Sequence, residues 1–301
     1  MKKGILSAAI AYFLWGIFPI YFKALQVVPA TQILGHRIVW CFIFVKLTLL
    51  VTRQFKSWRV LLNRRVLLIY SVAAVLLAVN WLVYVWSVNA GFVVEASLGY
   101  FINPLVSVLL GVIFLREKLR PLQWVPVGIA AAGVLYLTLT LGSPPWIALT
   151  LAFSFGTYGL VKKMAPLDSL FGLSLETAIL FVPALAYLIF CETQGSGSFV
   201  HTGGWVSGLL AFTGVISAIP LLLFAVGVRS APLSTIGLLQ YITPTLQFLL
   251  GVLLFGESFT PNRLAGFILV WAALVFFTIE SMLAQRKGLQ PFPVETISEP
   301  E

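Results

Sequence analysis

The ionisable side chains inside long apolar stretches are the first candidates for chemistry in this chain. His36 and Arg37 lie about seven residues into one stretch, which at about 1.5 Å per residue is roughly 10 Å deep. Glu176 occupies the position equivalent to His36 after an offset of 140 residues. Ionisable groups inside a membrane commonly mark function. A cationic and an anionic group at matching depths suit a gate or the neutralisation of a charged substrate, and the alternative for Arg37 is a structural pair.

Uncharged polar and aromatic side chains form a second group of candidates. Asn80 and Tyr84 are four residues apart and therefore share one face of a helix. An aromatic lining with a few amides and hydroxyls suits a small, partly apolar solute. The complete set of predicted site residues is Trp15, His36, Arg37, Asn80, Tyr84, Tyr100, Asn103, Tyr158, Glu176, Gln240 and Tyr241.

Two prolines at equivalent positions, Pro104 and Pro244, are predicted to act as hinges and to border a cavity. A proline inside a helix removes one backbone hydrogen bond and frees the carbonyl four residues earlier, which can then face a cavity. The paired placement predicts a central cavity between the two helices that carry these prolines. A static kink is the alternative for any single proline.

The elements that must position these residues follow from an internal repeat. The second half of the chain repeats the spacing of the first, in that Pro104, Gly111, Glu117 and Pro121 return as Pro244, Gly251, Glu257 and Pro261. Each copy holds five apolar segments, and because five is odd the second copy must be inverted. We predict repeats over residues 1–143 and 144–285, a substrate site between them, and a disordered cytoplasmic tail over 286–301. The repeated glutamates are predicted to fix the turns that follow them.

The predicted fold class is an all-α integral membrane protein with ten transmembrane helices. Apolar residues make up 60% of the chain and charged residues 10%, against about 45 to 50% apolar residues in soluble domains. The first apolar run is too long for a signal peptide. The helices are predicted at about 4–25, 30–51, 66–88, 91–115, 122–141, 145–164, 169–190, 204–228, 231–255 and 263–284.

The distribution of charge orients the chain. Most of its 19 basic residues fall on the side of the N-terminus, whereas Lys23 and Arg263 fall on the other side. The positive-inside rule therefore predicts that both termini are cytoplasmic. The same spread along short loops argues against a partner nucleic acid, which would need a basic patch with stacking aromatics.

The chain lacks the sequence motifs of several functional classes. The chain has no phosphate-binding loop for ATP, no ion-selectivity filter, no metal-ligand spacing, and no cofactor motif. Its two cysteines form no disulfide framework. Its acids do not converge as they would in an enzyme. An integral-membrane enzyme or lipid-handling protein remains the alternative to a carrier.

The residues also carry a family resemblance. The segments concerned are Gly4 to Lys23, Gly35 to Trp40, Asn80-Trp81, Glu95 to Pro104, Pro232 to Pro244 and Phe255 to Glu257. In these the chain resembles the EamA-type transporters of the drug/metabolite transporter superfamily, and within them the RarD group. The resemblance implies a five-plus-five inverted fold in the bacterial inner membrane that moves metabolites or drugs. It leaves the solute undefined.

The predicted function is therefore secondary, ATP-independent transport of a small metabolite or drug by alternating access, in the direction of export. The predicted cavity is formed by the first, third, fourth, sixth, eighth and ninth helices. Coupling to protons is considered through Glu176 or His36. The expected partners are a small-molecule solute and membrane lipid, and the sequence is compatible with a monomer or a homodimer.

Overall fold

The computed structural model describes residues 2–53, 63–115, 120–141, 144–230 and 239–286, and these are helical with short connections. A 3₁₀ turn, η1 (Pro121–Gln123), precedes α6, and a π turn, η2 (Leu250–Leu254), follows α11. The α-helices are α1 (Lys2–Lys23), α2 (Ala30–Val51), α4 (Arg64–Asn89), α5 (Val93–Leu115), α6 (Trp124–Leu141), α7 (Trp146–Met164), α8 (Ser169–Thr193), α9 (Gly204–Ser230), α11 (Ile242–Leu249) and α12 (Pro261–Arg286).

Eight of the helices in the described part of the chain are long and apolar enough to cross a membrane. The other two are α7, which carries hydroxyl groups and ends in lysines, and α11, which is short. The predicted helix over 231–255 therefore differs from the structure. Its first eight residues lie outside the described ranges, and near its end the π turn η2 replaces regular α-helix.

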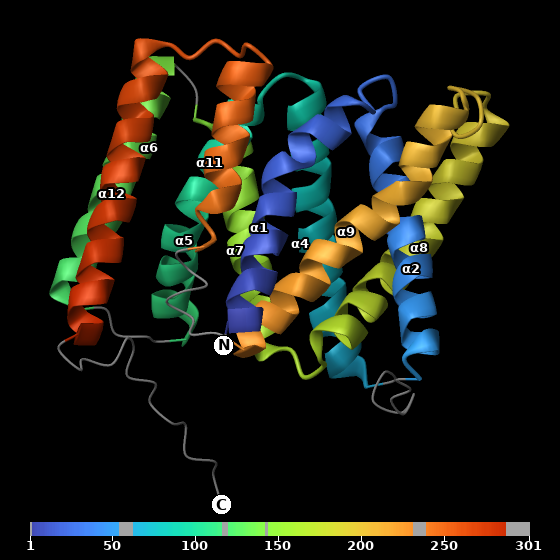
Figure 1. The fold of residues 1–301 in the computed structure, drawn as a ribbon, viewed down its shortest axis with the longest axis horizontal. Coiled ribbons are helices and arrows are strands. Elements are labelled where there is room, and N and C mark those ends of the chain that lie inside the picture. Colours follow the sequence, from blue (N-terminus) through green and yellow to red (C-terminus); the bar gives the residue numbers. More distant parts are fainter. Residues whose placement is uncertain (1, 54–62, 116–119, 142–143, 231–238, 287–301) are drawn as a thin grey trace, which may run out of the picture.

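Successive helices run in alternating directions (Figure 1). The connections at 24–29, 90–92, 194–203 and 255–260 gather at one end of the molecule, which we call the loop end. The first turn of α1 and the last turn of α12 lie at the opposite end, which we call the terminal end. The two ends of the described chain therefore lie on the same side of the helix bundle.

The helices pack in matched pairs. The 140-residue offset relates α1 to α7, α2 to α8, α4 to α9, α5 to α11 and α6 to α12. The most extensive contacts between non-equivalent helices of the two halves come in matched pairs: α5 packs on α7 as α11 packs on α1, α4 packs on α7 as α9 packs on α1, and α4 packs on α8 as α9 packs on α2. Other contacts join helices to their own equivalents, namely α2 to α8, α5 to α11 and α6 to α12, and α5 also contacts α12. The halves therefore interlock.

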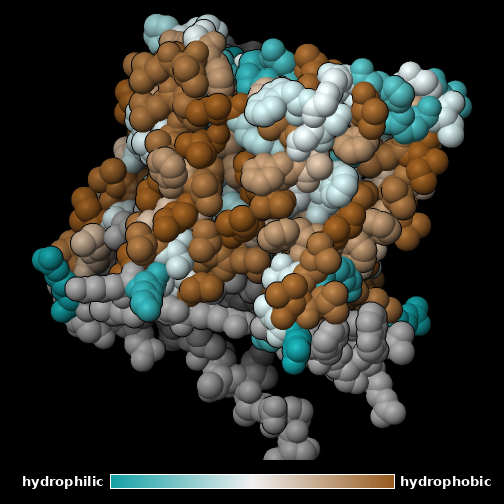
Figure 2. Space-filling view, turned by 45° about the vertical axis from the view of Figure 1, so that its right-hand side comes forward, coloured by the Kyte–Doolittle hydropathy of each residue, from teal (hydrophilic) through white to brown (hydrophobic). Residues whose placement is uncertain are grey.

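The outer surface is apolar. Large hydrophobic side chains such as Phe13, Leu68 and Leu139 are exposed on it. Figure 2 shows hydrophobic residues covering the middle of one face, with hydrophilic residues gathered toward the two ends. Polar side chains such as Asn80 and Gln247 are buried inside instead. This arrangement fits a surface in contact with lipid and an interior that carries the polar chemistry.

Glycines let the helices approach closely at particular points. A Cβ on Gly99 of α5 would lie 2.7 Å from the carbonyl oxygen of Ala148 in α7, and a Cβ on Gly214 of α9 would overlap the carbonyl of Trp40 in α2. Gly128, by contrast, has no heavy atom within 4 Å of such a Cβ.

Glu257 joins the two halves. Its Oε1 and Oε2 accept hydrogen bonds of 2.7 and 2.8 Å from the backbone N–H groups of Val93 and Val94 at the start of α5. These N–H groups have no acceptor within the helix, and a carboxylate also opposes the positive end of the helix dipole. The prediction that Glu257 fixes the turn before Pro261 is therefore wrong, since it caps a helix of the other half. Glu117 lies outside the described residues.

Candidate functional site

A cavity of about 190 Å³ lies between the two halves. It is lined by the six helices predicted for it, namely α1, α4, α5, α7, α9 and α11 with the residues just before α11, and also by Arg37 from α2. Its polar lining residues are Arg37, Asn80, Asn103, Ser107, Ser217, Gln240, Thr243 and Gln247, and its aromatic ones are Tyr12, Trp15, Phe18, Trp81, Tyr84, Tyr100, Phe155 and Phe224.

The two halves contribute equivalent faces to this cavity. Seven pairs of lining residues are separated by the 140-residue offset: Trp15 and Phe155, Leu77 and Ser217, Trp81 and Leu221, Tyr84 and Phe224, Tyr100 and Gln240, Asn103 and Thr243, and Ser107 and Gln247. The two residues of each pair occupy equivalent positions but have different side chains. The cavity is therefore symmetric in its construction and asymmetric in what it presents to a ligand.

Arg37 brings a buried cation to the cavity. Its Nε donates a hydrogen bond of 2.7 Å to Ser217 Oγ. Ser217 Oγ itself donates to the Thr213 carbonyl at 2.7 Å, so that it is oriented to accept from Arg37. The guanidinium carbon lies 3.9 Å from the centroid of the Trp81 ring and 5.2 Å from that of Phe22. Stacking and one hydrogen bond thus hold the guanidinium in place.

Amide and hydroxyl groups connect the helices around the cavity. Gln247 Nε2 donates to the Trp15 carbonyl and to Tyr84 Oη, both at 3.1 Å. Asn80 Nδ2 donates to the Leu151 carbonyl at 3.2 Å and to Ser154 Oγ at 3.0 Å. Each of these bonds crosses from one half to the other. The polar lining therefore positions the walls as well as presenting groups to a ligand.

The structure brings together eight of the thirteen predicted site and hinge residues. Those that line the cavity are Trp15, Arg37, Asn80, Tyr84, Tyr100, Asn103, Gln240 and Pro244. The five that do not are His36, Pro104, Tyr158, Glu176 and Tyr241.

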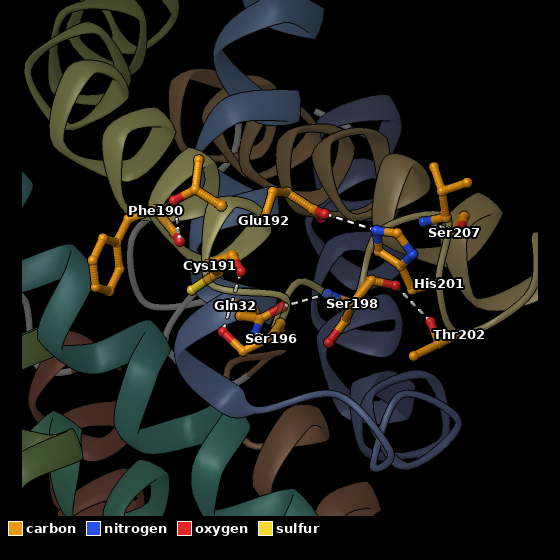
Figure 3. A network of polar contacts seen from close by, with 11 residues as sticks. Gln32, Phe190, Cys191, Glu192, Ser196, Ser198, His201, Thr202 and Ser207 are labelled. Atoms are coloured by element: carbon orange, nitrogen blue, oxygen red, sulfur yellow. Dashed lines mark hydrogen bonds and ion pairs between the residues drawn. The ribbon is translucent and has the colours of Figure 1, made fainter.

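His36 lies against the connection between α8 and α9. Its ring stacks on that of Phe199, with 5.0 Å between centroids. The connection is itself tied to α2 by Gln32, whose side chain donates to the Ser196 carbonyl at 2.8 Å and accepts from the Ser198 N–H at 2.9 Å (Figure 3). His36 therefore lies at the loop end, packed against the α8–α9 connection, and does not line the cavity.

Glu176 lies in a separate buried cluster. Its Oε1 is 2.7 Å from Lys162 Nζ, and its Oε2 accepts a hydrogen bond of 3.1 Å from Tyr158 Oη. Lys162 Nζ is also 5.3 Å from the centroid of the Tyr70 ring. The predicted anionic partner of the site is thus already paired with a lysine of the same half.

Tyr241 borders a second, more apolar cavity. This cavity of about 510 Å³ lies between α5, α11 and α12 and is also lined by Phe101, Phe248 and Trp271. Pro104 lies in α5 and is half-buried. Of the two predicted hinge prolines, only Pro244 borders the central cavity.

Sequence reasoning missed several lining residues, some of which the repeat could have revealed. Ser217, Phe224 and Gln247 are among them. Ser217 and Phe224 lie 140 residues after Leu77 and Tyr84, on the face of α9 that corresponds to the predicted face of α4. Applying the offset to the predicted Tyr84 would have added Phe224. Ser217 and Gln247, by contrast, correspond to Leu77 and Ser107, which were not among the predicted residues.

Comparisons with known proteins agree with this architecture. A model of the EamA-like transporter family matches residues 2–139 and again 144–279. Protein RarD of Streptomyces exfoliatus is 48% identical over 288 residues, which are 95% of this chain and 91% of that protein. The uncharacterised transporter YojE of Bacillus subtilis is 47% identical over 291 residues, 95% of this chain and 96% of that protein. A solved crystal structure, 18% identical, covers 93% of this chain and 98% of its own with a TM-score of 0.60, which shows a shared fold.

The family match covers nearly all of the chain in two copies, in agreement with the repeat in the sequence. The resemblance that the motifs suggested is confirmed, including the likeness to proteins named RarD. The chain is accordingly a multi-pass membrane transporter and not an enzyme. It belongs to the EamA-like transporter family.

Proposed function

We propose that this chain is a secondary, ATP-independent transporter that moves a small metabolite or drug by alternating access, in the direction of export. The observation that carries the proposal is the cavity between the halves, lined from both by equivalent faces. In carriers built from inverted repeats, the solute site lies at the interface of the repeats, and one repeat moves against the other around it. The alternating helix directions and matched contacts support this kind of construction.

The size and walls of the cavity favour a small solute. Its volume of about 190 Å³ is below the roughly 300 to 1,000 Å³ of typical ligand pockets. Aromatic rings from both halves form much of its wall, with Trp15, Tyr84 and Phe155 among them. Such walls bind a flat or partly apolar body. We therefore place the solute at the small end of the range of metabolites and drugs.

The orientation proposed is that the terminal end faces the cytoplasm of a bacterial cell, with the protein in the inner membrane. By the helix bounds, the terminal end carries Arg53 just after α2, Arg64 at the start of α4 and Arg286 at the end of α12. The loop end carries Lys23 at the end of α1 and Arg263 in the first turn of α12. An excess of basic residues on the cytoplasmic side is the usual determinant of orientation.

Glu176 is proposed as the group through which transport couples to protons. It is fully buried yet ionisable, and Lys162 and Tyr158 hold its two oxygens. Protonation of the carboxylate would weaken its ion pair with Lys162 and so loosen the contact between α7 and α8. A buried acid whose pairing depends on its proton is suited to this role.

Filling the cavity tests the proposed solute site. Gly159 borders the cavity, and no heavy atom lies within 4 Å of a Cβ built on it. Gly159→Phe should therefore fold and occupy the solute space, and counterflow of labelled solute in liposomes should fall at least about ten-fold, as expected for loss of about 1.4 kcal/mol of binding. The panel comprises labelled amino acids, aromatic metabolites and chloramphenicol.

Gly128→Phe is the matched control, because Gly128 also has open space around it but does not border the cavity. Its counterflow should equal that of the unchanged protein. Equal counterflow in both variants would place the solute elsewhere.

Cysteine labelling tests the orientation. Cys41 and Cys191 are buried, so the unchanged protein should react weakly with a membrane-impermeant maleimide. In intact cells, Ser258→Cys at the loop end should be labelled, whereas Thr52→Cys at the terminal end should be labelled only after the membrane is opened. The opposite pattern would show that the chain is inserted the other way.

Replacing Glu176 tests the proton coupling. Glu176→Gln keeps a hydrogen-bonding side chain but cannot exchange a proton. Accumulation of solute driven by a pH gradient should be abolished, while counterflow, which needs no driving ion, should continue at a similar rate. Tyr158→Phe, which removes only the hydroxyl bonded to Glu176, should retain gradient-driven accumulation. Normal accumulation in Glu176→Gln would exclude this residue as the coupling group.

A further inference from the structure

Arg37 places a buried positive charge at the central cavity, and burying a charge is energetically unfavourable. A guanidinium remains protonated in proteins, and Arg37 is only 4% exposed. Its Nε is bonded to Ser217, and its face is stacked on Trp81. These contacts orient the group but do not neutralise it, since neither partner carries a negative charge.

The described part of the chain supplies no carboxylate to Arg37. Glu280 and Glu176 there form ion pairs with Arg120 and Lys162, and Glu192 contacts His201. The titratable groups that face the guanidinium are instead the neutral side chains of Tyr21, Cys41, Tyr84 and Tyr100.

One nitrogen of the guanidinium is also without a partner. Nη1 of Arg37 is buried and makes no hydrogen bond within the described residues. A buried charge with an unsatisfied donor lowers the stability of the folded protein. In most proteins a nearby acidic side chain offsets this cost by pairing with the charge. A group that enters the cavity with a negative charge would supply both the missing charge and the missing acceptor.

Two further polar atoms at the cavity, both acceptors, have no hydrogen-bond partner among the described residues. They are Asn103 Oδ1 on α5 and Gln247 Oε1 on α11, and each is buried. Gln247 is held by the bonds from its Nε2 to Trp15 and Tyr84, so its oxygen has a defined position. These oxygens suit an N–H or O–H donor on the same ligand that an anionic group anchors at Arg37.

We propose that the solute is a small organic carboxylate with a flat apolar body and a hydrogen-bond donor, bound with its carboxylate on Arg37 and its donor on Asn103 or Gln247. The planar fork of a guanidinium matches the two oxygens of a carboxylate. The aromatic walls favour an organic body over an inorganic anion such as phosphate, which would leave the rings without a partner. This inference rests on the proposed transport function and specifies its substrate class.

The test measures binding directly. The melting temperature of the purified protein in detergent is followed as 4-hydroxyphenylacetate or its uncharged amide, 4-hydroxyphenylacetamide, is added. Phenylacetate and inorganic phosphate are measured alongside. The carboxylate should stabilise the protein saturably and bind at least ten-fold more tightly than the amide, a difference of about 1.4 kcal/mol. Phenylacetate, which lacks the hydroxyl donor, should bind more weakly, and phosphate should have no effect.

Variants of Arg37 assign the effect to the guanidinium. Arg37→Gln should lose at least ten-fold in affinity for the carboxylate and leave its affinity for the amide unchanged. Arg37→Lys, which keeps the charge but not the fork, should fall between the two. Arg286→Gln removes an exposed arginine at the end of α12 and should leave carboxylate affinity unchanged.

The outcomes separate this inference from the proposed function. Equal binding of acid and amide, unchanged carboxylate affinity in Arg37→Gln, stabilisation by phosphate alone, or no stabilisation by either carboxylate would overturn the inference. If Arg37→Gln does not fold, the comparison of acid with amide in the unchanged protein still decides. Counterflow of a neutral solute without carboxylate binding would leave transport standing, whereas carboxylate binding without counterflow would leave the site standing and reject transport.

Discussion

The hydrocarbon interior of a membrane cannot hydrogen-bond to polar groups, and this constraint explains most of the structure. Backbone groups must pair within helices, and polar side chains must turn inward. The exposed surface accordingly carries residues such as Phe13 and Leu139, while Asn80 and Gln247 point into the bundle and join its halves. The space where such groups gather is the central cavity. The polar lining of the cavity therefore follows from the need to keep polar side chains away from lipid.

Duplication supplies the scaffold and divergence supplies the chemistry. The same faces of equivalent helices border the cavity, yet the equivalent of Arg37 is Thr177, which does not border it, and the equivalent of Tyr84 is Phe224. Arg37 depends on both halves, because Trp81 from the first and Ser217 from the second hold it. A movement of one half against the other would change the contacts of Arg37 with Trp81 and Ser217. Binding of a solute at Arg37 is thereby linked to the conformational change proposed for transport.

The sequence predicted much of this because the signals were long and repeated. Apolar runs of about twenty residues define most helices, and the 140-residue offset identifies the helices that pair and the cavity between them. The sequence could not reveal side-chain contacts between residues that are far apart in the chain. The bond from Glu257 to the start of α5 and the pairing of Glu176 with Lys162 follow from tertiary packing. Depth alone placed His36 beside Arg37, but adjacent residues on a helix face different directions, and His36 faces the α8–α9 connection.

The most direct test of alternating access at this cavity is the reactivity of a cysteine placed in its wall. Ser107 borders the cavity, and the two native cysteines are buried. Ser107→Cys is exposed to a membrane-impermeant thiol reagent in right-side-out vesicles and, separately, in inside-out vesicles. Alternating access predicts reaction from both sides, slowed by a transported solute in each case. Reaction from one side only, or a rate that solute does not change, would contradict it.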